Sequence, residues 1–261
     1  MEQFNFKKNY GQNFLRNIVE IIRFCDIADI DPKDQILEIG PGDGAVTEEI
    51  LNRQAKVTAI EIDPELDLYL QAKFKGNENF HVINQDILIL DLNTLKLDKG
   101  FKVVSALPYN IAKKIVFKFL TSKMKAASLT FIMQKEVAED YAAFKQGQRK
   151  FLNIWAQTYC DEIIYHGDIA TQAFFPEPKV KGGIITFRKL KNPFLGSDKF
   201  LRFVRAGFSA PRKILSTNLH NIGFEKTKTE KILSNMKLNP KSRAGELDFN
   251  NWLKLYKNAL K

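Results

Sequence analysis

The chain has 261 residues, of which 44% are hydrophobic, enough to bury the core of one large domain or of one domain with an appendage. Two cysteines and three scattered histidines exclude a disulfide framework and a zinc-ligand spacing. The first residues have no signal-peptide core, and no apolar run of about 18 residues follows, so we expect a metal-free cytoplasmic protein with no membrane segment.

The formal net charge of +10 comes from the last quarter of the chain. Basic and acidic residues balance at 25 each over residues 1–190, whereas residues 191–261 hold 15 basic and 5 acidic residues. Such asymmetry is typical of a segment that binds a polyanion, most commonly nucleic acid and less commonly an acidic membrane surface. A solvated basic helical face is the plainer interpretation of the same charge.

Short apolar runs alternate with helical periodicity over the first half of the chain. The runs lie at residues 35–40, 56–63, 79–87, 101–109 and 128–133, with helices expected from about Ala45, Pro64 and Ile111. This alternation predicts βαβ units around a parallel sheet, the α/β class with a Rossmann-like arrangement. Two later runs, at 161–167 and 182–190, have no long helix between them, which predicts an antiparallel hairpin at the sheet edge.

The basic tail has a different pattern. Residues 191–197, KNPFLGS, are typical of a linker, and four stretches with helical spacing follow at 199–208, 212–224, 229–236 and 248–260. We therefore expect a larger domain at 1–190 and a small basic helical domain at 191–261.

A glycine-rich turn follows the first predicted strand, in the run EIGPGDGAVT at residues 38–47. Gly40 and Gly42 let the backbone turn tightly and approach a ligand at the carboxyl end of the strand. Their spacing is G-x-G-x-G rather than the G-x-G-x-x-G of dinucleotide-binding proteins, which argues against a pyrophosphate cradle.

Two acidic residues lie at the ends of the next two predicted strands. Glu61 lies 21 residues after Gly40, where a carboxylate can accept hydrogen bonds from both hydroxyls of a ribose, with Ile62 next to it. Asp86 is placed for an adenine amino group, and Ile87 beside it is an apolar wall. Either acid alone is more often a helix cap or a surface group. Together with the glycine turn, they predict S-adenosylmethionine as the cofactor.

The loop after the fourth predicted strand reads Ala106-Leu107-Pro108-Tyr109. In amine methyltransferases with an Asn-x-Pro-Tyr or Asp-Pro-Pro-Tyr loop, the side-chain oxygen and a backbone carbonyl accept hydrogen bonds from the target amine, and the aromatic ring stacks on the base. An exocyclic adenine amine is conjugated with its ring and is poorly nucleophilic, so it must be held with its lone pair toward the methyl donor. Without the cofactor motif, a simple turn explains Pro-Tyr equally well.

Several of these motifs occur together in one known family. The sequence resembles the KsgA family of ribosomal RNA adenine dimethyltransferases, related to the Erm methyltransferases, through GQNFL at 11–15, LEIGPGDGAVT at 37–47, AIEID at 59–63, Asp86, LPYNI at 107–111, QKEVA at 134–138, FFPEPKV at 174–180 and SRAGEL at 242–247. The resemblance implies a Rossmann-like methyltransferase domain with a small helical C-terminal domain. It also implies N6-dimethylation of adjacent adenosines near the 3′ end of small-subunit rRNA, as part of ribosome biogenesis, by a protein that we expect to be monomeric.

The resemblance also assigns residues by position. Asn13 and Leu15 would cover the cofactor, to which Ala106 is adjacent, and Tyr109 and Phe174 would hold the target adenine after it leaves its helix. Without the resemblance, Phe174 would be assigned to the core. The tail residues that would contact the rRNA backbone are Arg202, Arg205, Arg212 and Lys213.

The sequence departs from the family at Ala106, where the family has Asn. A methyl group cannot accept a hydrogen bond, and losing one acceptor in a buried site costs about 1–3 kcal/mol, or about ten- to hundredfold in rate. Ser105 has an oxygen, but neighbouring residues of a strand point to opposite faces. Further departures, at residues 149–153 and 181–182, indicate a diverged lineage.

Two functions remain open at this point. The chain is either an active or weakened adenine dimethyltransferase, or an RNA-binding ribosome-assembly or transcription factor that has kept the fold. We favour the enzyme, because a protein freed from catalysis has less reason to keep Glu61, Asp86 and Tyr109 together.

Overall fold

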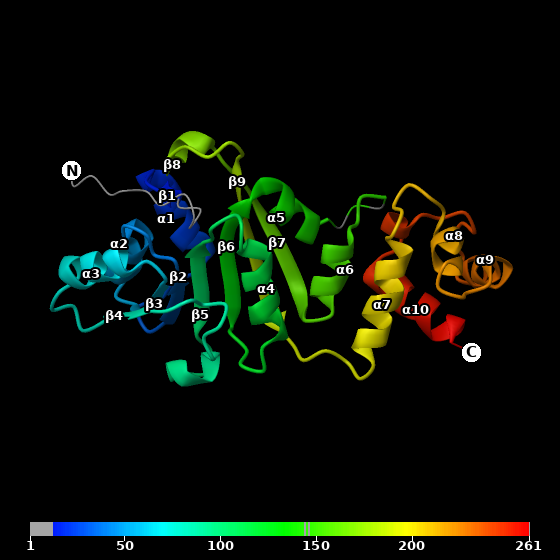
Figure 1. Ribbon diagram of the computed structural model, residues 1–261, viewed down its shortest axis with the longest axis horizontal. Helices are drawn as coiled ribbons and strands as arrows, with labels where there is room; N and C mark the ends of the chain where they lie inside the picture. Colours follow the sequence, from blue (N-terminus) through cyan, green and yellow to red (C-terminus); the bar gives the residue numbers. More distant parts are fainter. Residues whose placement is uncertain (1–12, 144, 146, 261) are drawn as a thin grey trace. The chain divides into compact units, whose positions relative to one another are not determined.

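The computed structural model describes residues 13–143, 145 and 147–260 (Figure 1). The chain forms two compact units, one of Met1–Glu139 with Asp161–Leu190 and the other of Asp140–Cys160 with Lys191–Lys261. In the described part of the chain, no helix is long and apolar enough to cross a membrane.

The first unit is built on a seven-stranded sheet with the order β4-β3-β2-β5-β6-β9-β7 (Figure 1). Strands β2 to β6 are parallel to one another, and β9 is antiparallel to β6. The predicted α/β fold is therefore confirmed. The strands are β2 (Gln35–Ile39), β3 (Lys56–Glu61), β4 (Phe80–Asn84), β5 (Lys102–Ala106), β6 (Ser128–Gln134), β7 (Cys160–Ile169) and β9 (Gly182–Leu190).

The strand order reverses between β2 and β5. The chain adds β3 and β4 on one side of β2 and then returns to add β5 and β6 on the other side. In open α/β sheets such a reversal leaves a crevice at the carboxyl ends of the two central strands, where ligands bind. The topology thus places the residues that follow β2, β3, β4 and β5 around one crevice.

The predicted hairpin is present at the sheet edge. Ile169 lies beside Gly182, His166 is hydrogen-bonded to Thr186, and Glu162 pairs with Lys189, so β7 and β9 run in opposite directions. The connection between them contains η3 (Thr171–Ala173) and the short strand β8 (Phe174–Phe175). Strand β8 pairs with β1 (Phe14–Leu15) in a separate two-stranded sheet that the sequence pattern did not predict.

Helices cover the sheet, and two of them begin at residues that favour a helix start. Helix α3 begins at Pro64 after Asp63, whose side chain accepts a hydrogen bond from the Glu65 backbone, a common combination at a helix start. Helix α2 begins at Ala45, directly after the glycine turn. The helices of this unit are α1 (Ile18–Ile27), α2 (Ala45–Asn52), α3 (Pro64–Lys73), η2 (Leu92–Leu95), α4 (Ala112–Thr121) and α5 (Lys135–Tyr141), of which the last two residues belong to the second unit.

The second unit is helical and has an aromatic core. The Phe203 and Trp252 rings meet edge to face with centroids 6.0 Å apart. The Phe208 ring stacks on the same Trp252 indole, with centroids 5.5 Å apart. Its helices are α6 (Phe151–Gln157), α7 (Ser197–Gly207), α8 (Leu215–His220), α9 (Lys226–Asn235), η4 (Ala244–Glu246) and α10 (Phe249–Ala259).

This unit extends beyond the expected boundary at residue 190, because it also contains Asp140–Cys160. The Arg205 guanidinium of α7 lies 5.0 Å from the Phe151 ring centroid of α6, and the Lys191 backbone donates to the Tyr159 carbonyl at 2.7 Å. These contacts link segments far apart in the sequence, which periodicity along the chain cannot show. The assignment of methyl transfer to one part of the chain and RNA binding to the other stays a prediction.

Candidate active site

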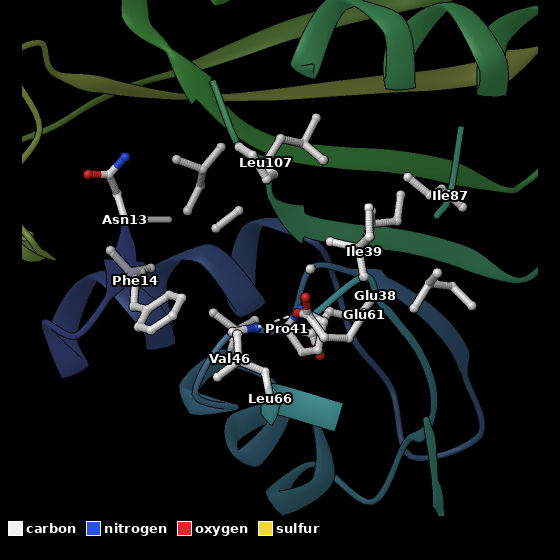
Figure 2. A pocket seen from close by; sticks show the side chains of 18 of the residues that line it. Asn13, Phe14, Glu38, Ile39, Pro41, Val46, Glu61, Leu66, Ile87 and Leu107 are labelled. Atoms are coloured by element: carbon white, nitrogen blue, oxygen red, sulfur yellow. Dashed lines mark hydrogen bonds between the residues drawn. The ribbon is translucent and has the colours of Figure 1, made fainter. Parts of the chain in front are cut away.

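A pocket with an empty volume of about 960 Å³ opens at the carboxyl ends of the central strands (Figure 2). In the view of Figure 2, Asn13 and Phe14 lie at one end of the pocket, Ile87 lies at the other, and Leu107 lies across from Glu61. The pocket lies wholly within the first unit.

The glycine turn forms one wall of this pocket. Gly40 and Gly42 both have a φ of +62°, the left-handed region that residues with a Cβ rarely adopt. A Cβ built on Gly42 would lie 2.6 Å from a ring carbon of Phe14, so the turn and β1 are packed directly together. Glycine at this position therefore serves both the backbone conformation and the closure of the pocket.

Glu61 ends β3 and is 4% exposed. Its carboxylate accepts hydrogen bonds from the backbone N–H groups of Asp63 at 2.9 Å and Gly42 at 3.4 Å. Burial raises the pKa of Glu61 to about 7, and the two backbone donors oppose that shift. Ile62, next to it, lines the same pocket. A buried carboxylate with an apolar neighbour suits the hydroxyls of a ribose.

A second buried carboxylate was missed from the sequence. Glu38 of β2 is 2% exposed, lines the pocket, and accepts a hydrogen bond from the Thr47 hydroxyl at 2.6 Å. Burial, with a smaller contribution from the charge of Glu61, raises the pKa of Glu38 to about 8. The available sequence signal was a charged residue inside the apolar run at 35–40, two positions before Gly40.

Asp86 lies two residues beyond the end of β4, in the turn that follows the strand, rather than at the strand end itself. One carboxylate oxygen accepts a hydrogen bond from the Leu88 backbone at 2.8 Å, so Asp86 does cap a turn. It also lines the pocket together with Ile87. The structural and the ligand-binding interpretations of this residue are therefore compatible.

The charge of the lining discriminates between cofactors. Four carboxylates line the pocket, from Glu38, Asp43, Glu61 and Asp86, and none of the described lining residues is Lys or Arg. Burial keeps Glu38 largely protonated at pH 7 and Arg16 pairs with Asp43, so the discrimination comes from the lining's lack of a lysine or arginine, among the described residues, to pair with the phosphates of a dinucleotide. The residues present thus fit S-adenosylmethionine, which has a positively charged sulfonium and no phosphate.

The loop after β5 forms the opposite wall. Ala106 pairs with Ile132 of β6, and the Leu107 backbone donates to the Ile132 carbonyl at 2.9 Å. The Pro108 carbonyl accepts from the first turn of α4, which holds the loop at its other end. Ser105 is fully buried, and its hydroxyl donates to the Ile39 carbonyl. Its oxygen is thus committed elsewhere and does not line the pocket.

Tyr109 contributes its ring rather than its hydroxyl. The hydroxyl oxygen is fully covered and has no hydrogen-bond partner among the described residues, and burial raises the pKa of Tyr109 to about 12. The phenol is therefore neutral at physiological pH. The ring is the part of this side chain available to a ligand in the pocket.

Strands β1 and β8 bring Phe174 to the pocket. Leu15 pairs with Phe174, and the Arg16 backbone donates to the Ala173 carbonyl at 2.8 Å. The Arg16 guanidinium forms an ion pair with Asp43 at 2.8 Å and lies 5.3 Å from the Phe175 ring centroid. This guanidinium therefore ties β1 to the glycine turn and to β8. The first two residues of the motif at 11–15, Gly11 and Gln12, lie outside the described residues.

The structure brings the predicted pocket residues together, although their individual roles remain predictions. All thirteen line the pocket: Asn13, Leu15, Gly40, Gly42, Glu61, Ile62, Asp86, Ile87, Ala106, Leu107, Pro108, Tyr109 and Phe174. The four predicted RNA-contacting residues, Arg202, Arg205, Arg212 and Lys213, belong to the second unit and are exposed.

Comparisons with known proteins agree with this geometry. A sequence profile of the family described as ribosomal RNA adenine dimethylase matches residues 3–261. The chain is 34% identical over 261 residues to ribosomal RNA small subunit methyltransferase A of Fusobacterium nucleatum, with 98% of each chain covered, and 35% identical over 257 residues to the protein of that name from Mycoplasma mycoides, with 96% of each covered.

Two solved structures share the fold over most of the chain. The crystal structure of the 23S rRNA methyltransferase ErmE has a TM-score of 0.77 at 26% identity and covers 95% of this chain and 100% of its own. A dimethyladenosine transferase from Plasmodium falciparum has a TM-score of 0.73 at 22% identity, covering 94% of this chain and 98% of its own, which shows the fold alone.

The pKa of Glu61 predicts a pH dependence of cofactor binding. Ribose hydroxyls donate to an ionised carboxylate, so affinity for S-adenosylmethionine should rise about tenfold from pH 6 to pH 8 as Glu61 loses its proton near pH 7. Calorimetric titration at several pH values measures this rise. The Glu61→Gln variant is the control, and its affinity should lack this rise with pH. If the wild-type affinity depends on pH no more steeply than that of the variant, Glu61 does not bind the ribose.

The pKa of Glu38 predicts a pH dependence of stability. The unfolded carboxyl loses its proton near pH 4.5 and the folded one near pH 8, so folding stability should fall as the pH rises between these values. Glu38→Gln removes this loss. Its free energy of unfolding, measured with urea, should therefore rise relative to that of the wild type by on the order of 3 kcal/mol from pH 5 to pH 9. The exposed Glu78→Gln is the control. If the difference in unfolding free energy between Glu38→Gln and the wild type is the same at pH 5 and pH 9, Glu38 is not a buried acid with a raised pKa.

Proposed function

The chain belongs to the ribosomal RNA adenine dimethylase family and is an S-adenosylmethionine-dependent methyltransferase of the Erm and KsgA type; from this premise we propose its reaction. It methylates N6 of adjacent adenosines near the 3′ end of small-subunit rRNA, as a step in ribosome biogenesis. The observation that supports this most directly is one pocket with an acidic part for the cofactor and an aromatic part for a base.

The cofactor supplies a methyl group on a sulfonium, and the residues of the chain hold it. Glu61 accepts hydrogen bonds from the ribose, and Asp86 accepts one from the adenine amino group between Ile62 and Ile87. Asn13 and Leu15 cover the ligand from β1, and the glycine turn allows its close approach. The acidic lining favours the positive charge of the bound donor before transfer.

The acceptor adenine is held by rings and by the backbone. The base leaves its helix and lies between Tyr109 and Phe174, while a carbonyl of the loop at residues 106–108 accepts a hydrogen bond from its amine. Rate acceleration then comes from orientation, with the N6 lone pair aimed at the methyl carbon, more than from acid–base catalysis.

The second unit provides the RNA contact. Residues 140–160 and 191–261 hold 18 basic and 6 acidic residues, a net charge of +12, whereas the rest of the chain has −2. Arg202 and Arg205 lie on α7, and Arg212 with Lys213 precedes α8. These side chains contact rRNA phosphates and position the enzyme without reading sequence. The protein acts in the cytoplasm as a monomer and has no membrane partner.

A second function is favoured by Ala106. A family member that lacks the side-chain acceptor could bind the cofactor and the small subunit and act as an assembly or transcription factor. The enzyme is the better supported proposal, because the cofactor pocket is complete around the altered loop.

One experiment separates the two functions. When the protein is incubated with labelled S-adenosylmethionine and small subunits that lack these methyl groups, the label should appear on adenosines in the 3′-terminal segment of the rRNA. Subunits already fully methylated are the control and should take up none. Cofactor binding with no transfer to either subunit would favour the binding-factor function instead.

The basic residues before α8 predict the salt dependence of RNA binding. The double variant Arg212→Gln/Lys213→Gln should weaken binding to small-subunit rRNA and lower the slope of log affinity against log salt by about 1.5, since each lost phosphate contact contributes about 0.7–0.9. A filter-binding series in salt measures it. The matched pair Lys33→Gln/Lys99→Gln changes exposed lysines at the amino ends of β2 and β5 and should leave the slope unchanged. Equal slopes for both pairs would exclude the proposed contact.

A further inference from the structure

The part of the pocket around Ala106 is apolar, in contrast to the four carboxylates elsewhere in the lining. Ala106 pairs with Ile132, and a Cβ built on Gly182 would lie 3.3 Å from Ile132 and 3.1 Å from Phe174, so these side chains are neighbours. Leu107, Pro108 and Ile111 complete this surface, which we call the acceptor surface.

Two hydroxyl groups next to the acceptor surface are not available to it. The Ser105 hydroxyl donates to the Ile39 carbonyl, and the Tyr109 hydroxyl is fully covered. Among the described residues, the acceptor surface therefore presents methyl, methylene and aromatic groups, and its hydrogen-bond acceptors are backbone carbonyls.

This chemistry discriminates between two forms of the amine. Adenosine N6 has two N–H donors, and one backbone carbonyl satisfies only one of them, which leaves the other unpaired in an apolar surrounding. Leaving a buried donor unpaired lowers the rate about ten- to hundredfold. N6-methyladenosine has one N–H donor, and its methyl group occupies the second position, where contact with Ala106 and its apolar neighbours is favourable.

We propose that this enzyme prefers N6-methyladenosine to adenosine and therefore acts mainly on the second methylation. The proposal rests on the proposed function and specifies its substrate. In the step, the N6 lone pair forms the new C–N bond as the bond between sulfur and the methyl carbon breaks, its electron pair stays on sulfur as a neutral thioether, and the N6 proton passes to water. The singly methylated adenosine then comes either from this enzyme's own slower first transfer or from another N-methyltransferase.

Single-turnover methyl transfer tests the preference. Small subunits are reconstituted with a 3′-terminal rRNA segment that carries either adenosine or N6-methyladenosine at the acceptor positions. The methylated acceptor should react at least about tenfold faster. Adenosine reacting at least as fast overturns the preference and leaves the methyltransferase assignment intact, whereas no transfer to either acceptor overturns both.

The variant Ala106→Asn tests the residue. A side-chain oxygen at this position can pair with the second N–H, so the variant should raise the adenosine rate about ten- to hundredfold and reduce or reverse the preference. The matched control Ala72→Asn, on the exposed face of α3, should keep the wild-type preference. An unchanged rate ratio in Ala106→Asn would assign the selectivity elsewhere and overturn the proposal.

A binding measurement gives a readout that does not depend on turnover. With S-adenosylhomocysteine present as the unreactive product, RNA carrying N6-methyladenosine should bind the wild type about tenfold tighter than RNA carrying adenosine. In Ala106→Asn this ratio should fall toward one. Equal wild-type affinities would count against an acceptor surface that selects the methylated amine.

Discussion

The burial of two carboxylates at the carboxyl ends of β2 and β3 is the constraint on which the site depends. Glu38 and Glu61 are almost completely shielded from water, and both keep raised pKa values. Buried acids are unfavourable unless their oxygens have donors, and here the donors are the Thr47 hydroxyl and the backbone at Gly42 and Asp63. In the proposed site, the remaining acceptor capacity of Glu61 serves the ribose of the cofactor, which would offset the unfavourable burial of this carboxylate.

The same crevice has a second wall of opposite character. Across the pocket from the acidic residues, the loop after β5 presents backbone carbonyls, rings and methyl groups. Strands β1 and β8, which are about 160 residues apart in the sequence, pair at the edge of the same pocket. The Arg16 guanidinium joins this closure to the glycine turn through Asp43. A cationic donor and a flat, weakly nucleophilic amine have different requirements, and in the proposed reaction each wall serves one of them.

Local patterns predicted much of the fold and most of the pocket. The alternation of strands and helices, the start of α2 at Ala45 and of α3 at Pro64, and the clustering of strand-end residues all depend on short-range chemistry and on parallel topology. Glu38 was missed because a single charge inside an apolar run looked like an ordinary strand residue. The pairing of β1 with β8, and of residues 140–160 with the tail, depends on contacts distant in sequence, which no periodicity encodes.

The division of one pocket into a cofactor half and an acceptor half is the central claim, and a structure of a ternary complex tests it most directly. With S-adenosylhomocysteine and an RNA fragment containing N6-methyladenosine, the ribose hydroxyls should lie on the Glu61 carboxylate, with the cofactor adenine beside Ile87. The acceptor base should lie between Tyr109 and Phe174, with its methyl group against Ala106. A cofactor ribose away from Glu61, or a base that does not lie between Tyr109 and Phe174, would contradict the account.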